Sequence, residues 1–332
     1  MSSAIIIAKE VLSMVRRIAV LTSGGDAPGM NAAVRAVIRA GLYQGKEMFV
    51  IFDGYKGLVE GDIRQVTKEF TQDIINRGGT ILRSSRLPEF KEEAIQLKAI
   101  ERLRDLDIDA LVGIGGDGTY RGLLDLARHG FPVIGIPGSI DNDVASTDWT
   151  IGFYTALNTI CDCVDKIKDT SSSHQRCSII EVMGRHCGDL AVYSSIAEAA
   201  ELTITYDHPY DEEHIFKKLR KLKAQKKSHA IVIVSENLLD VHDLAKKIED
   251  KTGFDTNVEI LGHLQRGGAP TAFDRILASR MGAKAIECLL NGEYGKVIGS
   301  VKEDIVAIDI EEALAMKRDT HEQLLSLINM LQ

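Results

Sequence analysis

The segment Val133–Asp143, VIGIPGSIDND, joins an apolar run to a turn that carries two carboxylates. The run Val133–Ile136 is typical of a buried strand, and Pro137–Asp143 should form the turn at its carboxyl end. Ligands bind at that edge of an open parallel sheet, where Asp141 or Asp143 could take a proton from a substrate hydroxyl. Asp-Asn-Asp is also ordinary turn chemistry, so the segment alone leaves a purely structural role open.

Apolar strand-like runs alternate with amphipathic stretches along the chain, which predicts an α/β protein with mostly parallel sheets and helices on both faces. The strands are expected at 18–21, 48–52, 110–114, 133–136, 177–182, 202–205, 230–234 and 258–261. The helices are expected at 29–43, 92–105, 119–129, 153–168, 187–200, 212–224, 241–251 and 273–291. Because no flexible linker is evident, we expect two lobes between which the chain crosses more than once.

The composition limits the class of protein. The chain has 332 residues, of which 45% are hydrophobic and 27% charged, and this predicts a soluble globular protein of two domains or lobes. A formal net charge of −8 gives no indication of nucleic-acid or anionic-membrane partners. No apolar run reaches the ~18 residues of a membrane span.

The cysteines and the first residues bear on the compartment. We expect no signal peptide, because residues 1–13 have neither a basic start nor a convincing cleavage site. These residues are expected to be an N-terminal extension, either disordered or a mis-assigned start. The scattered cysteines show no zinc spacing, so we expect them to be buried, reduced thiols of a cytoplasmic protein. They are Cys161, Cys163, Cys177, Cys187 and Cys288.

A first glycine turn, Thr22–Asn31, reads TSGGDAPGMN and follows the strand expected at 18–21. Adjacent Gly24 and Gly25 allow main-chain N–H groups to approach an anion, and the positive end of the next helix adds to this. The turn has neither the Gly-Lys-Ser/Thr of a Walker A loop nor the Gly-x-Gly-x-x-Gly fingerprint. A plain tight turn would explain one glycine, so phosphate binding is a hypothesis at this point.

A second glycine turn, Gly115–Thr119, reads GGDGT and lies between the strand 110–114 and a helix expected from Tyr120. It places another anion-binding turn at the carboxyl end of a strand. Asp117 lies inside it, and a carboxylate beside a polyphosphate is reasonable where Mg²⁺ lies between them. Asp117 could also be a simple helix cap.

Arginines recur at further strand ends and glycine turns, where a guanidinium can grip a phosphate with two hydrogen bonds. Any single arginine is more often a surface charge, but arginines in four such segments are hard to explain by accident. The segments are RSSR at 83–86, SSSHQR at 171–176, MGR at 183–185 and HLQRGG at 263–268. Glu236 follows the strand 230–234 and, as an acceptor, suits sugar hydroxyls.

With these motifs, the chain resembles the bacterial ATP-dependent 6-phosphofructokinases from about Arg16 to about Gly299. The jointly specific motifs are TSGGDAPGMNAA, GIGGDGTY, PGSIDND, DTSSSHQR, EVMGRHCGD and LGHLQRGG. The resemblance implies the two-lobed phosphofructokinase fold and transfer of the ATP γ-phosphoryl group, with Mg²⁺, to the 1-hydroxyl of D-fructose 6-phosphate. The products would be fructose 1,6-bisphosphate and ADP, in the committed step of glycolysis. It also implies a cytoplasmic, allosteric homotetramer whose active sites are shared between subunits.

The resemblance assigns roles by position. Residues 14–151 and about 264–312 would form the ATP-binding lobe, and 152–263 with about 313–332 the fructose 6-phosphate lobe. ATP would be held by Gly25, Arg86, Leu87, Gly116, Asp117, Gly118 and Thr119, with Asp117 on Mg²⁺. Asp141 would be the base, and the other catalytic residues would be Ser139, Asp143 and Arg185. The sugar phosphate would be bound by Ser139, Ile140, Asp141, Met183, Gly184, Arg185, Glu236, Asn257, His263 and Arg266, with Arg176 reaching over from a neighbouring subunit.

Some positions depart from the family pattern. Asn257 stands where a second arginine from the neighbouring subunit is usual, which predicts weak fructose 6-phosphate binding or compensation by a nearby cation. Ser139 replaces the usual threonine but keeps the hydroxyl. The effector site that binds ADP or phosphoenolpyruvate would include Arg35, Arg39, Lys168, Glu201 and Lys227. Glu198-Ala199 replaces a Gly-Gly pair there, and Lys68, Lys168 and Gln225 replace the residues usual at three further positions. These changes predict blunted or absent allosteric control.

Three alternatives stay open beside an active 6-phosphofructokinase. A catalytically weak paralogue could serve as a regulatory or sugar-phosphate-binding subunit, as Asn257 and the altered effector positions suggest. The acceptor could be another sugar phosphate, or the chain a different GGDGT kinase, although the segment His263–Arg266 argues against the latter. A nicotinamide dehydrogenase is remote, because the dinucleotide fingerprint is missing. Gly118 and Gly138 fit the ATP users rather than the pyrophosphate-dependent relatives.

Overall fold

The computed structural model describes residues 15–206, 210–318 and 322–331, so the expected extension at 1–13 lies outside the described residues. The chain divides into two compact units. Unit 1 contains the described residues up to Ile140 together with Val144–Tyr154 and Arg266–Arg318. Unit 2 contains Asp141–Asp143, Thr155–Gln265 and the described residues beyond Arg318. Each unit is therefore assembled from separate stretches of the chain.

Unit 1 is built on a sheet with the strand order β12-β11-β5-β4-β1-β2-β3, and β6 pairs with the end of β5. The outer pairs β2–β3 and β11–β12 are antiparallel, whereas the inner pairs are parallel. The strands are β1 Arg17–Thr22, β2 Glu47–Ile51, β3 Ile63–Val66, β4 Ala110–Gly115, β5 Val133–Ser139, β6 Ile151–Gly152, β11 Lys296–Val301 and β12 Asp304–Asp309.

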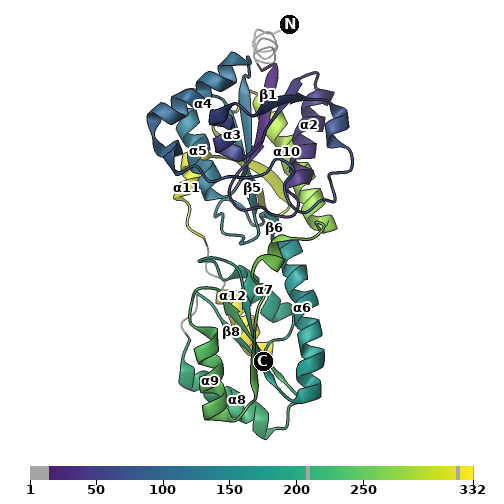
Figure 1. The fold of residues 1–332 in the computed structure, drawn as a ribbon, viewed down its shortest axis with the longest axis vertical. Coiled ribbons are helices and arrows are strands. Elements are labelled where there is room, and N and C mark those ends of the chain that lie inside the picture. Colours follow the sequence, from purple (N-terminus) through teal and green to yellow (C-terminus); the bar gives the residue numbers. More distant parts are fainter. Residues whose placement is uncertain (1–14, 207–209, 319–321, 332) are drawn as a thin grey trace. The chain divides into compact units, whose positions relative to one another are not determined.

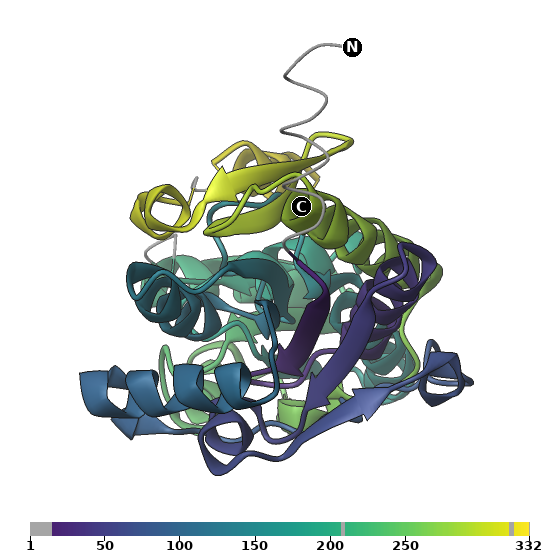
Figure 2. The ribbon, with the colours of Figure 1, turned by 90° about the horizontal axis from the view of Figure 1, so that it is seen from above.

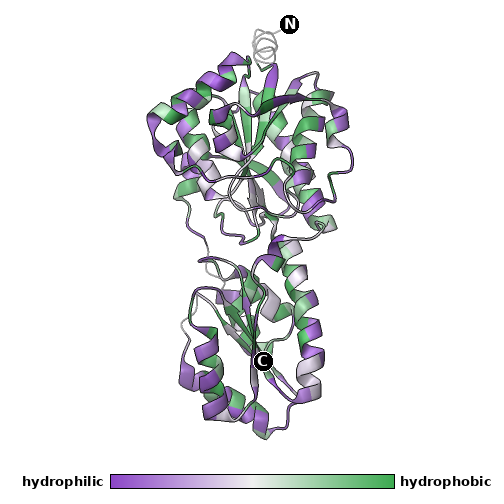
Figure 3. Cartoon of the chain, viewed as in Figure 1, coloured by the Kyte–Doolittle hydropathy of each residue, from purple (hydrophilic) through white to green (hydrophobic). Residues whose placement is uncertain are grey.

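Helices cover both faces of this sheet (Figures 1 and 2). Helices α2 and α10 pack together on one face, and α3, α4, α5 and α11 lie on the other. Their bounds are α2 Met30–Tyr43, α3 Gly54–Glu60, α4 Glu93–Asp105, α5 Asp117–Arg128, α10 Ala272–Leu290 and α11 Ile310–Ala315, with short 3-10 turns at Lys68–Thr71 and Pro88–Lys91. Apolar residues concentrate on the strands and the inner helix faces (Figure 3), as burial of apolar surface requires.

Unit 2 has a sheet with the strand order β10-β7-β9-β8, and its strands run parallel. Helices α8 and α9 lie on one face and α6 on the other (Figure 1). The strands are β7 Cys177–Val182, β8 Leu202–Ile204, β9 Ala230–Ser235 and β10 Thr256–Ile260. The helices are α6 Phe153–His174, α7 Asp189–Ala197, α8 Glu212–Ala224, α9 Val241–Thr252 and α12 Glu322–Leu331, with a 3-10 turn at Gly262–Arg266.

The predicted α/β class with mostly parallel sheets and helices on both faces is confirmed. Some boundaries were wrong. The helix expected from Tyr120 begins at Asp117, so most of the second glycine turn is the first helical turn of α5. Strand β5 continues to Ser139, because Gly138 and Ser139 pair with β6 and are thereby held extended. Helix α6 ends at His174 rather than near residue 168.

Several elements were missed, among them the hairpin of β11 and β12. Its turn contains Lys302, whose φ of 58° is left-handed, and such turns are normally signalled by glycine or asparagine. The cysteines are free, but Cys161 and Cys163 of α6 are only half-buried, contrary to expectation. Among the described residues, no helix has both the length and the apolar character needed to span a membrane.

Candidate active site

The first glycine turn leaves β1 and enters α2 in unit 1. Gly24 has a φ of 87° and Gly29, which precedes the helix, a φ of 107°. Both values lie in the left-handed region that costs glycine no steric penalty. A Cβ on Gly29 would also lie 2.6 Å from Ile151 Cγ2. The chain therefore needs glycine here to turn sharply and to present the amides at the start of α2.

The two glycine turns contact each other at the carboxyl ends of the adjacent parallel strands β1 and β4. The Ser23 amide donates to the Ile114 carbonyl at 3.0 Å, and the Thr119 hydroxyl donates to the Ser23 carbonyl at 3.2 Å. A Cβ on Gly115 would lie 2.3 Å from that carbonyl oxygen. Gly115 thus permits the close approach that joins the turns into one surface.

Gly116 and Gly118 serve no such packing purpose. A Cβ on either would meet no atom within 4 Å, and neither has a φ in the left-handed region. What these glycines leave is open space over the N-terminus of α5, where free N–H groups and the helix dipole favour an anion. The Asp117 side chain is 45% exposed beside this space.

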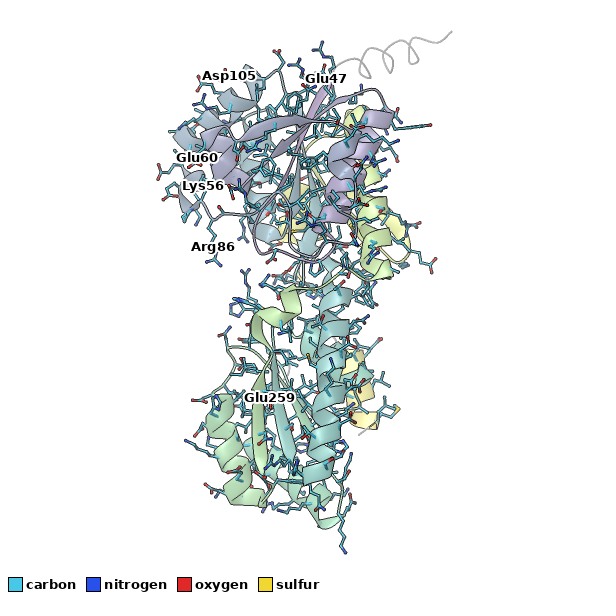
Figure 4. All side chains as sticks on the ribbon, turned by 45° about the vertical axis from the view of Figure 1, so that its right-hand side comes forward. Glu47, Lys56, Glu60, Arg86, Asp105 and Glu259 are labelled. Carbon is cyan, nitrogen blue, oxygen red and sulfur yellow. The ribbon has the colours of Figure 1, made fainter. Side chains whose placement is uncertain are left out.

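The arginine segment of unit 1 separates into two kinds of residue. Arg83 forms ion pairs with Asp53 at 2.7 Å and Asp62 at 3.2 Å, so it stabilises the loop. Arg86 is exposed and has no ion pair or hydrogen bond with the residues that the structure describes; its side chain points away from the ribbon of its unit (Figure 4). Leu87 is half-buried against the apolar cluster beneath it. Arg86 is therefore available to a ligand, whereas Arg83 is not.

Arg266 also belongs to unit 1 and lies against the first glycine turn. Its Nη1 donates to the Asp26 carbonyl at 3.2 Å, and a Cβ on Gly25 would lie 2.5 Å from that same nitrogen. The guanidinium thus fills the volume that a larger residue at position 25 would need. Its positive charge adds to the anion-attracting character of this turn.

The turn Asp141–Asp143 belongs to unit 2 and follows Ile140, which is 1% exposed. Asp141 is 5% exposed, and Asn142 has a left-handed φ of 51°, a conformation that asparagine tolerates better than most residues. The Asp143 carboxylate lies 4.0 Å from the Arg185 guanidinium. The structure thus brings the expected catalytic residues Asp141, Asp143 and Arg185 to one part of unit 2. Ser139 ends β5 in unit 1, where its carbonyl accepts a hydrogen bond from Thr150.

A second turn in unit 2, Met183–Gly188, follows β7. Gly184 has a φ of 136°, and its carbonyl accepts the Cys187 amide at 2.8 Å, which closes the turn. Arg185 lies at its tip with a φ of 55° and a 65% exposed side chain. The Arg185 amide donates to the Glu236 carboxylate at 2.9 Å.

Glu236 is anchored at the end of β9. Its amide donates to the Val182 carbonyl at 2.8 Å, and its own carbonyl accepts the Tyr206 hydroxyl at 2.7 Å. Burial, and then the charge of Glu236, raises the pKa of the neighbouring Glu181 carboxyl. The same two causes raise the pKa of Tyr206, so its hydroxyl keeps its proton for the bond to Glu236.

Gln265 has an organising role that the sequence did not indicate. It is 0% exposed; its Oε1 accepts the Met183 amide at 3.0 Å, and its Nε2 donates to the Gly262 carbonyl at 2.9 Å. It thereby ties the Met183–Gly188 turn to the 3-10 turn that carries the exposed His263. Its neighbours in the sequence, Leu264 and Arg266, give no local signal of this role.

The two residues expected to act at a subunit boundary lie in unit 2. The Arg176 guanidinium is paired with Asp255 at 2.5 Å and is about one-third exposed. Asn257 is half-buried on the edge strand β10, in register with Ser178 of β7. Neither side chain is placed near Arg185 or Glu236 by a hydrogen bond or ion pair in the part of the chain that the structure describes.

Comparison with known proteins identifies the family. The family model described as phosphofructokinase matches residues 17–289. The chain belongs to the phosphofructokinase family. A curated relative from Teredinibacter turnerae named ATP-dependent 6-phosphofructokinase is 54% identical, over 96% of this chain and all of the relative. One of the same name from Photobacterium profundum is 53% identical over the same shares.

A solved family structure supports the assignment. The phosphofructokinase of Saccharomyces cerevisiae superimposes with a TM-score of 0.84 at 33% identity, over 95% of this chain. The chain spans less than half, 46%, of the length of that yeast chain. A pyrophosphate-dependent phosphofructokinase from Marinobacter aquaeolei, with a TM-score of 0.84 at 19% identity, shares the fold.

The residues expected at the family's effector site fall in both units. In unit 1, Arg35, Arg39 and Arg275 line a hollow of about 490 Å³. In unit 2, Lys168 is hydrogen-bonded to Glu198, and Lys227 to Glu201. Both glutamates are nearly buried, at 6% and 5% exposure. The cations of unit 2 are therefore already neutralised by carboxylates of the chain.

Proposed function

We propose that this protein is an ATP-dependent 6-phosphofructokinase that transfers the γ-phosphoryl group of ATP to the 1-hydroxyl of D-fructose 6-phosphate. The observation that carries the proposal is the joined pair of glycine turns, with open space at Gly116 and Gly118 and no packing reason for glycine at either position. Relatives that match 96% of the chain carry this activity in their names. A phosphofructokinase needs such a surface for the triphosphate, because positioning and charge neutralisation dominate phosphoryl transfer.

Unit 1 would hold the nucleotide. The amides of Gly25 and Gly116–Thr119 would accept the phosphate oxygens, Arg86 would reach the phosphates, and Leu87 would contact the nucleoside. Asp117 is the residue suited to Mg²⁺, since its carboxylate is accessible and magnesium prefers oxygen ligands from one or two carboxylates plus phosphates. The described residues contain no group of three or more His, Cys, Asp or Glu side chains that could hold a metal ion. When bound, Mg²⁺ neutralises the phosphate charge.

The residues of the acceptor step would be Asp141, Asp143, Arg185 and Ser139. Asp141 accepts the proton of the 1-hydroxyl while that oxygen forms its bond to the γ-phosphorus and the bond from phosphorus to the ADP oxygen breaks. Arg185 has an exposed guanidinium suited to the charge of the transferring group. Asp143 lies close enough to Arg185 to orient it, and the Ser139 hydroxyl can donate to substrate oxygens.

Unit 2 would bind the sugar phosphate. Glu236 is a fixed acceptor for sugar hydroxyls, and the main chain at Met183 and Gly184 lies beside it. The 6-phosphate would be held by His263 together with Arg266, which belongs to unit 1, and Ile140, also of unit 1, would contact the substrate. Arg176 and Asn257 would act across a subunit boundary in a homotetramer, for which Arg176 must leave Asp255. The proposed reaction is the committed step of glycolysis and implies a cytoplasmic protein.

Control by ADP or phosphoenolpyruvate would be weak. Glu198 and Glu201 already satisfy Lys168 and Lys227, so an effector phosphate would have to displace a buried carboxylate from each cation. Fructose 6-phosphate saturation curves measured with and without ADP test this. A strong leftward shift on adding ADP would contradict it.

A coupled assay for ADP release with ATP and fructose 6-phosphate tests the main proposal. Wild-type protein should turn over, and Asp141→Ser should lose several orders of magnitude in kcat because proton removal and alignment of the nucleophile are lost together. Absence of sugar-dependent ADP release from folded wild-type protein would refute the proposal, as would full activity of Asp141→Ser.

A further inference from the structure

A buried carboxylate beside the turn Asp141–Asp143, here called the acceptor turn, has no assigned role in the reaction. Asp189 lies in the first turn of α7 and is 0% exposed. Its Oδ2 accepts the Asn142 amide Nδ2–H at 2.8 Å, and its Oδ1 accepts the Cys187 thiol at 3.1 Å. One carboxylate is thus hydrogen-bonded to both turns of unit 2, the one with Asp141 and the one with Arg185.

The placement of Asp189 is costly unless its hydrogen bonds compensate. A carboxylate loses its hydration on burial, which is tolerated when the group is hydrogen-bonded. The N-terminus of α7 also favours a negative charge in the first turn. Both oxygens of Asp189 have donors, so the residue is suited to fix two segments at once rather than to fill space.

The Asn142 side chain is the group through which Asp189 fixes the acceptor turn. Asn142 is 1% exposed and adopts a φ of 51°, so the main chain reverses at this residue between Asp141 and Asp143. Anchoring its amide fixes the direction in which both neighbouring carboxylates leave the main chain. Cys187, which closes the second turn through its amide to Gly184, is anchored by the same Asp189.

We infer that Asp189 is a positioning residue for the phosphoryl-transfer step: through Asn142 and Cys187 it holds Asp141 and Arg185 at a fixed separation. The inference rests on the proposed function and deepens it. Asp189 is hydrogen-bonded to the two turns that carry Asp141 and Arg185, so its loss should act on the chemical step. Small displacements of reacting groups lower the rate steeply, whereas binding through distant contacts is maintained.

The test combines steady-state kinetics with thermal melting of the full chain. Asp189→Ala should lower kcat by about 100-fold, the cost of a misplacement near 1 Å, with an unchanged KM for ATP. Asp189→Asn retains an oxygen that can accept the Asn142 amide and should restore kcat to within about tenfold of wild type. Asn142→Gly keeps the left-handed conformation but removes the amide, so it should reproduce the kcat loss.

A double variant and a matched control separate positioning from folding. Because both changes break the same hydrogen bond, Asp189→Ala with Asn142→Gly should lose no more than the larger single loss. Ser194→Ala removes a 0% exposed hydroxyl from the same helix and should lower the melting temperature without lowering kcat.

Three outcomes would overturn the inference. They are wild-type kcat in Asp189→Ala, multiplying losses in the double variant, or an equal kcat loss in Ser194→Ala. Wild-type protein that is folded but inactive would overturn the proposed function as well, whereas active wild type beside unaffected Asp189 variants would overturn the inference alone.

Discussion

In unit 1 the turns that would hold the nucleotide are joined mainly by close main-chain approach, whereas in unit 2 the turns that would hold the sugar are bridged by buried polar side chains. Gly115 lets the two backbones approach closely, and the bonds between them use the amide and carbonyl of Ser23, the Ile114 carbonyl and the Thr119 hydroxyl. Asp189 and Gln265 instead bridge turns with their side chains. The first arrangement is vulnerable to added volume, and the second to lost hydrogen bonds. The two units should therefore fail in different ways when mutated.

The largest effect is expected from Gly115→Ala. The new Cβ would lie 2.3 Å from the Ser23 carbonyl oxygen and 2.2 Å from the Thr119 hydroxyl, so both glycine turns must separate. Overpacking of this kind costs about 1–3 kcal/mol of stability. Misplacing the amides should also lower kcat/KM for ATP about 100-fold. Thermal melts and ATP saturation curves measure both, and a variant with wild-type affinity for ATP would show that the turns do not act together.

Much of this contrast could be predicted from the sequence, but unevenly. The glycine turns after 18–21 and 110–114 were recognised because glycine pairs at strand-to-helix junctions have a local physical reason. The need for glycine at position 115 could not be predicted, because Ser23 lies 92 residues away in the chain. Only the pairing of β1 with β4 brings the two residues together. The sequence likewise placed Asp141 and Arg185 in turns without indicating what fixes those turns.

The residues that the sequence missed share one property. Asp189 and Gln265 lie inside the motifs EVMGRHCGD and LGHLQRGG, beside charged residues whose charge itself indicates a role in binding phosphate. Their roles depend on complete burial and on partners in other segments, neither of which a local pattern encodes. The extension of β5 to Ser139 depended in the same way on pairing with the two residues of β6.

Gln265→Met should weaken sugar binding and leave nucleotide binding intact. Methionine fills similar space but leaves the Met183 amide and the Gly262 carbonyl without this partner. Each buried group left unpaired costs about 1–3 kcal/mol of stability. Because those groups position Met183 and His263, we expect KM for fructose 6-phosphate to rise about tenfold.

The control for Gln265 is a buried glutamine of unit 1. Gln96 is 6% exposed, and its Nε2 donates to the Phe90 carbonyl at 3.0 Å. Gln96→Met should lose comparable stability with an unchanged sugar KM. Equal KM changes in both variants would mean that Gln265→Met weakens sugar binding through global destabilisation.

Gly118→Ala should separate folding from binding in unit 1. Alanine is favoured over glycine inside a helix by about 0.5–1 kcal/mol, and the new Cβ would meet no atom of the chain within 4 Å. The melting temperature should therefore rise while KM for ATP also rises, because the methyl group occupies space proposed for the phosphates. A more stable variant with an unchanged KM for ATP would place the nucleotide elsewhere, and Gly115→Ala, which loses stability, is the matched contrast.

The smallest expected effect is a pH dependence from one carboxyl of unit 2, Glu181, which has a raised pKa. Burial, and then the nearby Glu236, raises the pKa of Glu181. The native state therefore binds this proton more tightly than the unfolded chain, so stability is greatest below the ordinary glutamate pKa and falls as the pH rises through the folded-state value. Glu181→Gln, which carries no charge at any pH, should melt slightly higher than wild type at pH 7.

That advantage should disappear at pH 4, where Glu181 of the wild type is protonated in the folded protein. Melting curves between pH 4 and 7 measure it, and Glu259→Gln on the exposed edge strand β10 (Figure 4) should show no such pH-dependent gain. Only side-chain supports can respond to pH in this way, since the main-chain contacts between the glycine turns carry no titratable group. A Glu181→Gln advantage that persisted unchanged at pH 4 would show that shape, not charge, sets the stability at this position, and the contrast between the units would then rest on hydrogen bonding alone.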